Sequence, residues 1–197
     1  ERVAVTGDAT GDLWVWELAT CRQRTVLRGH RAKINAVAMS SDGALAASAG
    51  ADNTFRVWDT TRGEPIMTIE AFAAAGSSAG AIAGTKDVAF SPDDRSLVTV
   101  SATAVKRWHV TRAPLLDVIQ VDFGLYAARW SPDGTRLAIV GFGATLQERD
   151  RRIVFEAARD DAPWYAVDWS PDGTTMVMAG RKGDQMLNVH GLRLCDE

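Results

Sequence analysis

The stretch that decides the fold runs from Gly29 to Asp59 and reads GHRAKINAVAMSSDGALAASAGADNTFRVWD. It opens with Gly29-His30, closes with Trp58-Asp59, and holds three short apolar runs separated by two turn signals. Within the runs, apolar residues recur at every second position, which is the period of a strand with one buried face. The stretch therefore predicts short β-strands joined by tight turns.

A turn signal rich in Ser, Asp and Gly recurs along the chain. Its copies begin at residues 40, 91, 131 and 170, so they are 51, 40 and 39 residues apart. In the last three copies Pro presets φ, while Asp accepts local backbone hydrogen bonds and Gly takes positive φ. Asp94 replaces the Gly in one copy, and Asp also tolerates the left-handed conformation. A period near 40 residues indicates a repeat architecture.

Four apolar runs in most periods predict four short strands per repeat. The repeats cover approximately residues 1–30, 31–72, 84–123, 124–162 and 163–197. The first repeat lacks its innermost strand, and the last offers three strands and a stub at Leu192–Leu194. A four-stranded sheet with two apolar faces is unstable alone in water, whereas radial stacking of such sheets buries both faces. We therefore predict an all-β propeller of about five blades, forming part of a larger propeller.

An Ala-, Gly- and Ser-rich segment explains the longest spacing. Residues 73–83 lie between the second and third repeats, and their composition predicts a flexible insert on one rim of the propeller. Inside it, Gly76-Ser77-Ser78-Ala79-Gly80 matches the G-x-S-x-G pattern of hydrolase nucleophiles. That pattern needs a preceding strand and a following helix, and the low-complexity surroundings predict neither. We therefore expect no catalytic residue in this segment.

Composition and charge argue against several partner classes. Lys and Arg number 22 against 25 Asp and Glu, for a formal net charge of -3. Nucleic-acid binders usually carry a basic surplus, so we predict no nucleic-acid partner. The longest apolar runs are too short for a membrane-spanning helix, so we predict no membrane partner either. Cys21 and Cys195 make neither a disulfide framework nor a metal box, and we expect a cytoplasmic protein without metal or cofactor.

In these motifs the chain resembles the WD40-repeat family of β-propellers. The second repeat carries both Gly29-His30 and Trp58-Asp59, whereas the other repeats keep parts of the pattern, such as Val189-His190 at the place of Trp-Asp in the fifth. In that family a His, a turn Asp, a Ser or Thr and the Trp form a buried hydrogen-bonded tetrad. The positions that match are His30, Asp52, Ser48 and Trp58. The resemblance implies a structural role for all four residues and seven blades in the complete propeller.

The resemblance also implies where a partner binds. The partner-binding surface of the family is commonly the top rim, built from the start of each innermost strand and the turn between the second and third strands. The residues at these places are Lys33, Asn35, Lys86, Asp87, Tyr126, Trp164 and Tyr165. Aromatic residues with a few cations suit a binding hot spot, although these rings could instead pack beside the central channel. Tyr126 and Tyr165 occupy equivalent positions, so we expect two phenols side by side.

The sequence favours a binding scaffold over an enzyme. We expect a rigid disc that docks a protein or peptide on its top face, as the regulatory or sensor propeller of a larger, multidomain signalling protein. One alternative is a propeller enzyme with hydrolase or lyase chemistry in the central channel, but no acid or His recurs at the channel-facing strand starts. A second alternative is a periplasmic propeller whose leader was removed.

Overall fold

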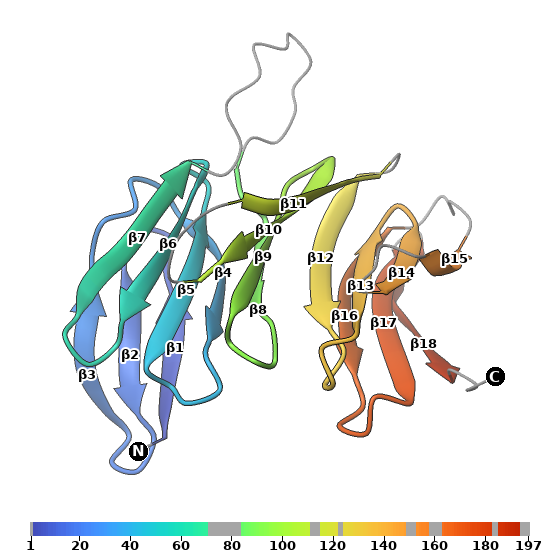
Figure 1. Cartoon of the computed structure of the whole chain (residues 1–197). Coiled ribbons are helices and arrows are strands. Elements are labelled where there is room, and N and C mark those ends of the chain that lie inside the picture. Colours follow the sequence, from blue (N-terminus) through green and yellow to red (C-terminus); the bar gives the residue numbers. More distant parts are fainter. Residues whose placement is uncertain are drawn as a thin grey trace, which may run out of the picture.

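Short strands joined by tight turns arrange into five antiparallel sheets in the computed structural model (Figure 1). The structure describes residues 2–70, 84–110, 115–121, 124–148, 153–157, 163–182 and 185–193, and of 153–157, 181–182 and 185–193 only the backbone. The predicted insert at 73–83, with its G-x-S-x-G match, lies outside the described residues. No helix in the described part of the chain has the length and apolarity to cross a bilayer.

The strands follow one another along the chain, and each sheet is a consecutive set. The first sheet holds β1 (Val3–Gly7), β2 (Leu13–Glu17) and β3 (Arg22–Leu27). The second holds β4 (Ile34–Met39), β5 (Leu45–Gly50), β6 (Thr54–Asp59) and β7 (Glu64–Glu70), and the third holds β8 (Asp87–Phe90), β9 (Ser96–Val100), β10 (Ala104–His109) and β11 (Leu115–Gln120). The fourth holds β12 (Leu125–Trp130), β13 (Arg136–Gly141), β14 (Ala144–Glu148) and β15 (Ile153–Ala157). The fifth holds β16 (Trp164–Trp169), β17 (Thr175–Lys182) and β18 (Gln185–Arg193).

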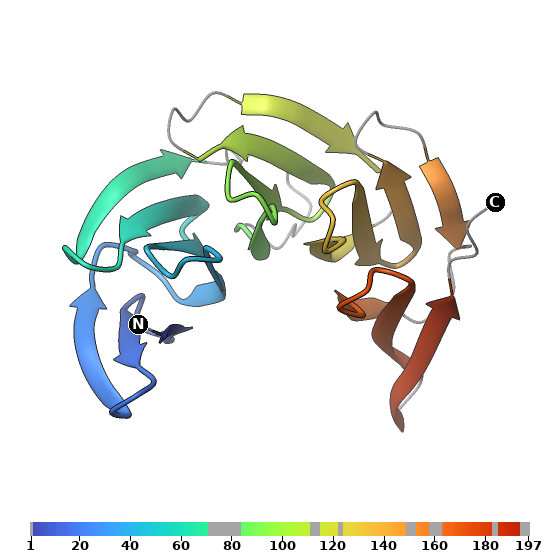
Figure 2. The same cartoon turned by 60° about the horizontal axis from the view of Figure 1, so that its bottom comes forward.

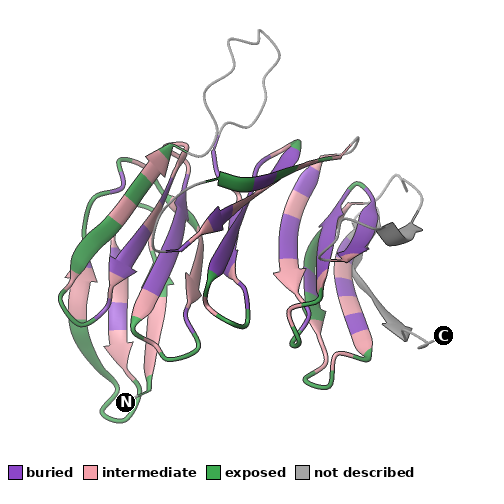
Figure 3. Ribbon diagram, in the orientation of Figure 1, coloured by how far each residue is buried: buried purple, intermediate pink, exposed green. Residues whose placement is uncertain are grey.

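The sheets stand side by side in an open arc, with β4, β8, β12 and β16 along its inner side (Figure 2). This is the blade arrangement of a β-propeller, which confirms the predicted fold class. Apolar clusters fill the space between successive sheets; between the second and third, Phe55 and Val57 pack with Val88 and Leu97. Equivalent clusters lie between the other neighbours. Burial is therefore greatest on the middle strands, while the outer strands β3, β7 and β11 are more exposed (Figure 3).

The turn between the first two strands of a blade has one geometry in four sheets. Gly43, Gly134 and Gly173 have φ between 70° and 73°, and Asp94 has φ 53° at the equivalent place. Asp94 therefore adopts in the third sheet the left-handed conformation that Gly adopts in the other three. Its carboxylate also accepts hydrogen bonds from the N–H and hydroxyl of Ser41, in the turn of the second sheet. The turns thus link neighbouring blades as well as neighbouring strands.

The fifth sheet differs from the sequence-based prediction in two places. Strand β18 continues to Arg193, so the predicted stub at Leu192–Leu194 is largely the end of the third strand. The register of β17 with β18 pairs Met176 with Leu192, whereas Val189 pairs with Ala179. Leu192 is therefore the residue at the place of Trp58, and the assignment of that place to Val189 was wrong. The error arose because β17 and β18 are longer than their equivalents, which moves the pairing along the chain.

Candidate functional site

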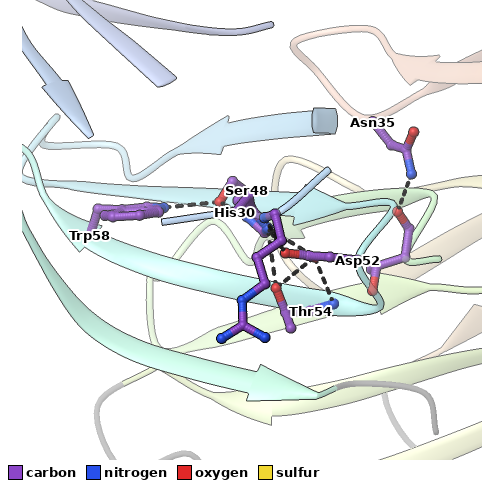
Figure 4. Close-up of polar contacts among 8 residues, drawn as sticks. His30, Asn35, Ser48, Asp52, Thr54 and Trp58 are labelled. Atoms are coloured by element: carbon purple, nitrogen blue, oxygen red, sulfur yellow. Dashed lines mark hydrogen bonds and ion pairs between the residues drawn. The ribbon is translucent and has the colours of Figure 1, made fainter. Parts of the chain in front are cut away.

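The four predicted network residues lie in one hydrogen-bonded chain in the second sheet (Figure 4). Trp58 Nε1 donates to Ser48 Oγ over 2.9 Å, and Ser48 Oγ lies 2.7 Å from His30 Nε2. On the opposite side of the imidazole, His30 Nδ1 lies 3.0 Å from the Asp52 carboxylate. Ser48 and Trp58 are fully buried, and the His30 ring is completely covered. Each of these buried polar atoms therefore has a partner, which avoids the cost of an unsatisfied buried group.

The charges in this network are set by burial and by hydrogen bonds. Burial opposes ionisation of Asp52, but the N–H of Arg31 and the hydroxyl of Thr54 lead the donors that lower its pKa to about 2. Burial lowers the pKa of His30 below its usual 6.5, although the Asp52 carboxylate acts in the opposite direction. The network therefore fits a neutral imidazole that donates Nδ1–H to Asp52 and accepts the Ser48 hydroxyl at Nε2.

The connections among Asp52, His30 and Ser48 are those of a Ser-His-Asp catalytic triad, but the surroundings are not. Ser48 has no exposed surface, and its oxygen already accepts the indole N–H of Trp58. A nucleophile must reach the carbonyl of a substrate, with donors placed for the oxyanion that forms. This hydroxyl has no path to a substrate, so the geometry supports a packing role rather than a chemical one.

Two other sheets keep only the bond between the Trp and the hydroxyl. Trp16 Nε1 donates to Thr6 Oγ1 in the first sheet, and Trp108 Nε1 donates to Thr99 Oγ1 in the third, both over 2.9 Å. The fourth sheet places Gln147 opposite Leu137, where the second sheet places Trp58 opposite Ala46. The tetrad is therefore complete in one blade and partial or replaced in others.

A second set of equivalent residues lies where the innermost strands β4, β8, β12 and β16 begin. We call this end of the sheets, together with the turns between second and third strands, the rim. Asn35, Lys86, Tyr126 and Tyr165 each stand five residues before the Ser of the next turn. In three sheets the pairing of the first strand with the second skips one residue, which marks a β-bulge. The skipped residues are Asn35, Tyr126 and Tyr165. Lys86 precedes β8, and its N–H bonds to the carbonyl of Val100, which also pairs with the next residue. We call these four residues the bulge row.

A β-bulge leaves one residue unpaired and turns its side chain away from the regular alternation. In the bulge row, the side chains of Asn35, Lys86 and Tyr126 reach the next sheet of the arc. Asn35 Nδ2 donates to the carbonyl of Thr85 over 2.9 Å, joining the second sheet to the third. Lys86 Nζ donates to the carbonyl of Leu125 over 2.9 Å and lies 4.4 Å from the centre of the Tyr126 ring. Partial burial lowers the pKa of the Lys86 ammonium.

The two tyrosines of the bulge row form the aromatic part of the rim. The Tyr126 and Tyr165 rings meet edge to face with centroids 4.9 Å apart, and Phe142 approaches Tyr126 at 6.0 Å. Tyr165 is 46% exposed and Phe142 is 42% exposed, although both are large apolar side chains. Phe142 lies in the turn between β13 and β14 and was not picked out from the sequence. The sequence could have indicated Phe142, because the turn between the second and third strands belongs to the expected rim.

The remaining predicted rim residues divide into three cases. Lys33 is exposed beside Asn35. Trp164 is half-buried and packs against the apolar cluster between the fourth and fifth sheets, so much of its ring serves the core. Asp87 was assigned to the rim wrongly: it is only 5% exposed, and its carboxylate accepts hydrogen bonds from Arg129 and the N–H of Ala128. Asp87 therefore joins the third and fourth sheets, and only its neighbour Lys86 belongs to the bulge row.

The described residues contain no group of three or more His, Cys, Asp or Glu side chains placed to hold a metal ion. The bulge row and Phe142 offer instead an ammonium, an amide, two phenols and an exposed phenyl ring. Such groups bind other molecules through ring contact and hydrogen bonds, without bond-making chemistry.

Radially stacked antiparallel sheets, joined by Ser-Asp turns and holding a Trp-Ser-His-Asp network, define a β-propeller built from WD repeats. A family model described as "WD domain, G-beta repeat" matches residues 21–59, which include the complete network. The chain belongs to the WD40-repeat family.

Curated plant proteins named RACK1 or RACK1y are similar to this chain. The small ribosomal subunit protein RACK1y of Oryza sativa subsp. japonica is 31% identical over 141 residues, which cover 68% of this chain and 39% of that protein. The small ribosomal subunit proteins RACK1 of Medicago sativa and Glycine max are each 30% identical, over 53% and 59% of this chain. The alignments cover 29% and 33% of those two proteins, so the chain spans between 29% and 39% of the length of these three relatives.

Proposed function

We propose that the chain is a non-catalytic binding propeller that docks a protein or peptide on the rim carrying the bulge row. The observation that carries this proposal is the cluster of Tyr126, Tyr165 and Phe142, in which two large rings are more than 40% exposed. Tyrosine is enriched at binding hot spots because its ring buries a large area while its hydroxyl still finds a hydrogen-bond partner.

The relatives support a place in a larger assembly. They are named as small ribosomal subunit proteins, and this name supports a protein partner and a cytoplasmic location for this chain. The proposal includes the regulatory or sensor role of the propeller in a larger protein. It also includes a larger ring: Trp58 is fully buried against the first sheet, whereas its equivalent Trp16 is only half-buried. Another blade packed on the Trp16 face would complete that burial.

A non-catalytic role is supported by the buried state of the triad-like residues. A purified preparation tested against a broad panel of ester, peptide and phosphoester substrates is expected to show no turnover. Turnover that depends on a rim or channel residue would favour the enzyme alternative.

The partner class needs a direct comparison because the relatives are ribosomal by name. The formal net charge of -3 supports protein over nucleic acid, since phosphate binding is driven by basic surplus. Affinity capture should therefore be run with and without ribonuclease. Captured proteins are expected to survive ribonuclease, and their loss would point to an RNA partner.

A double variant tests the rim itself. Tyr126→Ala with Tyr165→Ala is expected to reduce capture of the partner at least tenfold while leaving the urea midpoint nearly unchanged. The matched control is Thr135→Ala with Thr174→Ala, which alters two exposed residues in the turns at the opposite ends of the innermost strands. Equal capture by the two double variants would move the binding surface away from the rim.

A further inference from the structure

We propose that the bulge row selects an acidic partner segment, in which a carboxylate stands two residues from an aromatic side chain. The inference rests on the proposed function and names the chemistry of the partner at that same rim. Lys86 is assigned to the carboxylate, and the exposed rings of Tyr165 and Phe142 are assigned to the aromatic side chain.

The charges of the bulge row suit an acidic partner. The members of the bulge row are an amide, an ammonium and two phenols, so the row presents donors and no carboxylate. The carboxylate next to it in sequence, Asp87, is buried and neutralised by Arg129. Asp52, on the neighbouring turn, is occupied by His30, Thr54 and a backbone N–H. The bulge row itself therefore carries a positive charge, at Lys86, and this charge complements an acidic residue of a partner.

The ammonium group of Lys86 is held in position by its neighbours. An ammonium group has three N–H bonds. One N–H of Lys86 is directed at the carbonyl of Leu125, and the ring face of Tyr126 fixes the position of the group. The side chain is half-buried, so little rotamer entropy remains to be lost on binding. A carboxylate that binds here meets a cation already held in place.

The distances between Lys86 and the exposed rings suit a partner that carries an acid and an aromatic ring two residues apart. Lys86 lies against one side of Tyr126, and Tyr165 meets the same ring at a centroid distance of 4.9 Å. The Lys86 ammonium and the exposed Tyr165 ring are thus separated by the ring of Tyr126. Residues i and i+2 of an extended chain lie on one side and about 7 Å apart. An extended segment with an acid at i and an aromatic residue at i+2 matches this spacing.

The test measures binding of defined peptides to the whole chain. The probe is a twelve-residue acetylated peptide of three Glu-Gly-Phe-Gly repeats, titrated while ¹⁵N-labelled protein is followed by NMR. Two matched peptides replace every Glu with Lys or every Phe with Ala. The acidic aromatic probe is expected to bind at least fivefold more tightly than either, with the largest shifts around Lys86 and Tyr165. Equal affinity for the Lys-containing peptide would overturn the proposal.

Variants of the cation separate a specific pairing from general attraction. Lys86→Met keeps the apolar stem and is expected to weaken binding of the acidic probe at least fivefold, while Lys86→Arg stays within twofold of the parent. Arg95→Met removes an exposed charge in the turn between β8 and β9, at the other end of β8, and is expected to change affinity by less than twofold. Equal losses from Lys86→Met and Arg95→Met would contradict the assigned role of Lys86. Urea midpoints of the variants confirm that each is folded.

The two proposals fail in different ways. If partner capture requires Tyr126 and Tyr165 but peptide binding ignores the charge at Lys86, the rim still binds and the acidic specificity is wrong. If neither tyrosine affects capture or peptide binding, both proposals are wrong. A uridine dodecamer that binds the rim more tightly than the acidic probe would replace an acidic peptide with nucleic acid as the partner.

Discussion

The second and fourth sheets have the same strand order but are joined to their preceding neighbours by different chemistry. In the second sheet, Ser48 and Trp58 face the first sheet and belong to a hydrogen-bonded chain that ends at Asp52. In the fourth sheet, Ile139 stands at the place of Ser48 and Gln147 at the place of Trp58. Ile139 packs in the apolar cluster with the third sheet.

The difference shows that the blade does not require the polar network. Apolar packing stabilises the interface between sheets but does not fix the orientation of the side chains in it, because its free energy scales with buried area. A buried polar chain stabilises only one arrangement, because any other arrangement leaves its donors without partners. The network in the second sheet therefore holds the turn that carries Asp52 against His30 and fixes the entry to β4. Both lie beside the rim, so the network holds in place the surface that we propose for partner binding.

The largest expected effect comes from removing the indole. Trp58→Ala should lower the free energy of unfolding by about 3–5 kcal/mol, because it empties a large buried site. Gln147→Ala, at the equivalent place of the fourth sheet, should cost about 1 kcal/mol or less. Urea titrations of both variants test this difference. Similar midpoints for the two variants would mean that the network adds nothing to the packing.

The next effect separates the full network from the single bond. Ser48→Ala leaves both Trp58 Nε1 and His30 Nε2 without their partner, and should cost about 2–4 kcal/mol. Thr99→Val leaves only Trp108 Nε1 unpaired and should cost about 1–2 kcal/mol. Urea midpoints under identical conditions give the comparison. A larger cost for Thr99→Val would reverse the ranking of the two sheets.

Acid should weaken the second sheet through His30. Its pKa in the folded protein lies below the 6.5 of the unfolded chain, so the unfolded state binds more protons between those values. The stabilising contribution of neutral His30 to the free energy of unfolding is therefore complete above pH 6.5. It is lost as the pH falls toward the pKa of His30 in the folded protein. One proton limits the slope to about 1.4 kcal/mol per pH unit. Asp52, with a pKa of about 2, adds its own loss only below about pH 4.

Two histidine variants check the source of this slope. In urea titrations between pH 7 and 5, His30→Asn should flatten the pH dependence, whereas His109→Gln should retain it. If His30→Asn kept the full pH dependence of the free energy of unfolding, a group other than His30 would take up the proton.

The smallest effect on stability is expected at the rim. Tyr165→Ala removes a side chain that is nearly half exposed, so the free energy of unfolding should change by about 0.5 kcal/mol or less. Thermal unfolding beside the parent chain measures it. A loss comparable to that of Ser48→Ala would show that Tyr165 belongs to the core and would weaken its assignment to binding.

The strand pattern and the turns could be predicted from the sequence because they depend on local chemistry. Period-two apolar runs and Ser-Asp turns identified the repeats, and Asp94 adopts the left-handed conformation that its place in the turn demands. The equivalence of Tyr126 and Tyr165 followed from counting back from those turns, and their rings meet in the structure.

Other features depend on pairing between distant residues and could not be predicted. The bulges at the innermost strand starts arise from the ladder register, which neighbouring residues in the sequence do not reveal. In the third sheet, Lys86 lies at the rim and Asp87 is buried, although the two are adjacent in the chain. Burial of Asp87 depends on Arg129 in the next sheet, a partner 42 residues away. The shifted register of β18 has the same kind of cause.

The most direct test of the division between structural network and binding rim is site-specific photo-crosslinking to the captured partner. Benzoylphenylalanine replaces Tyr165 on the rim in one sample and Thr174, in the turn beyond the other end of β16, in a second. The account predicts a crosslinked partner from position 165 and none from position 174. A partner crosslinked only from position 174, or equally from both, would contradict it.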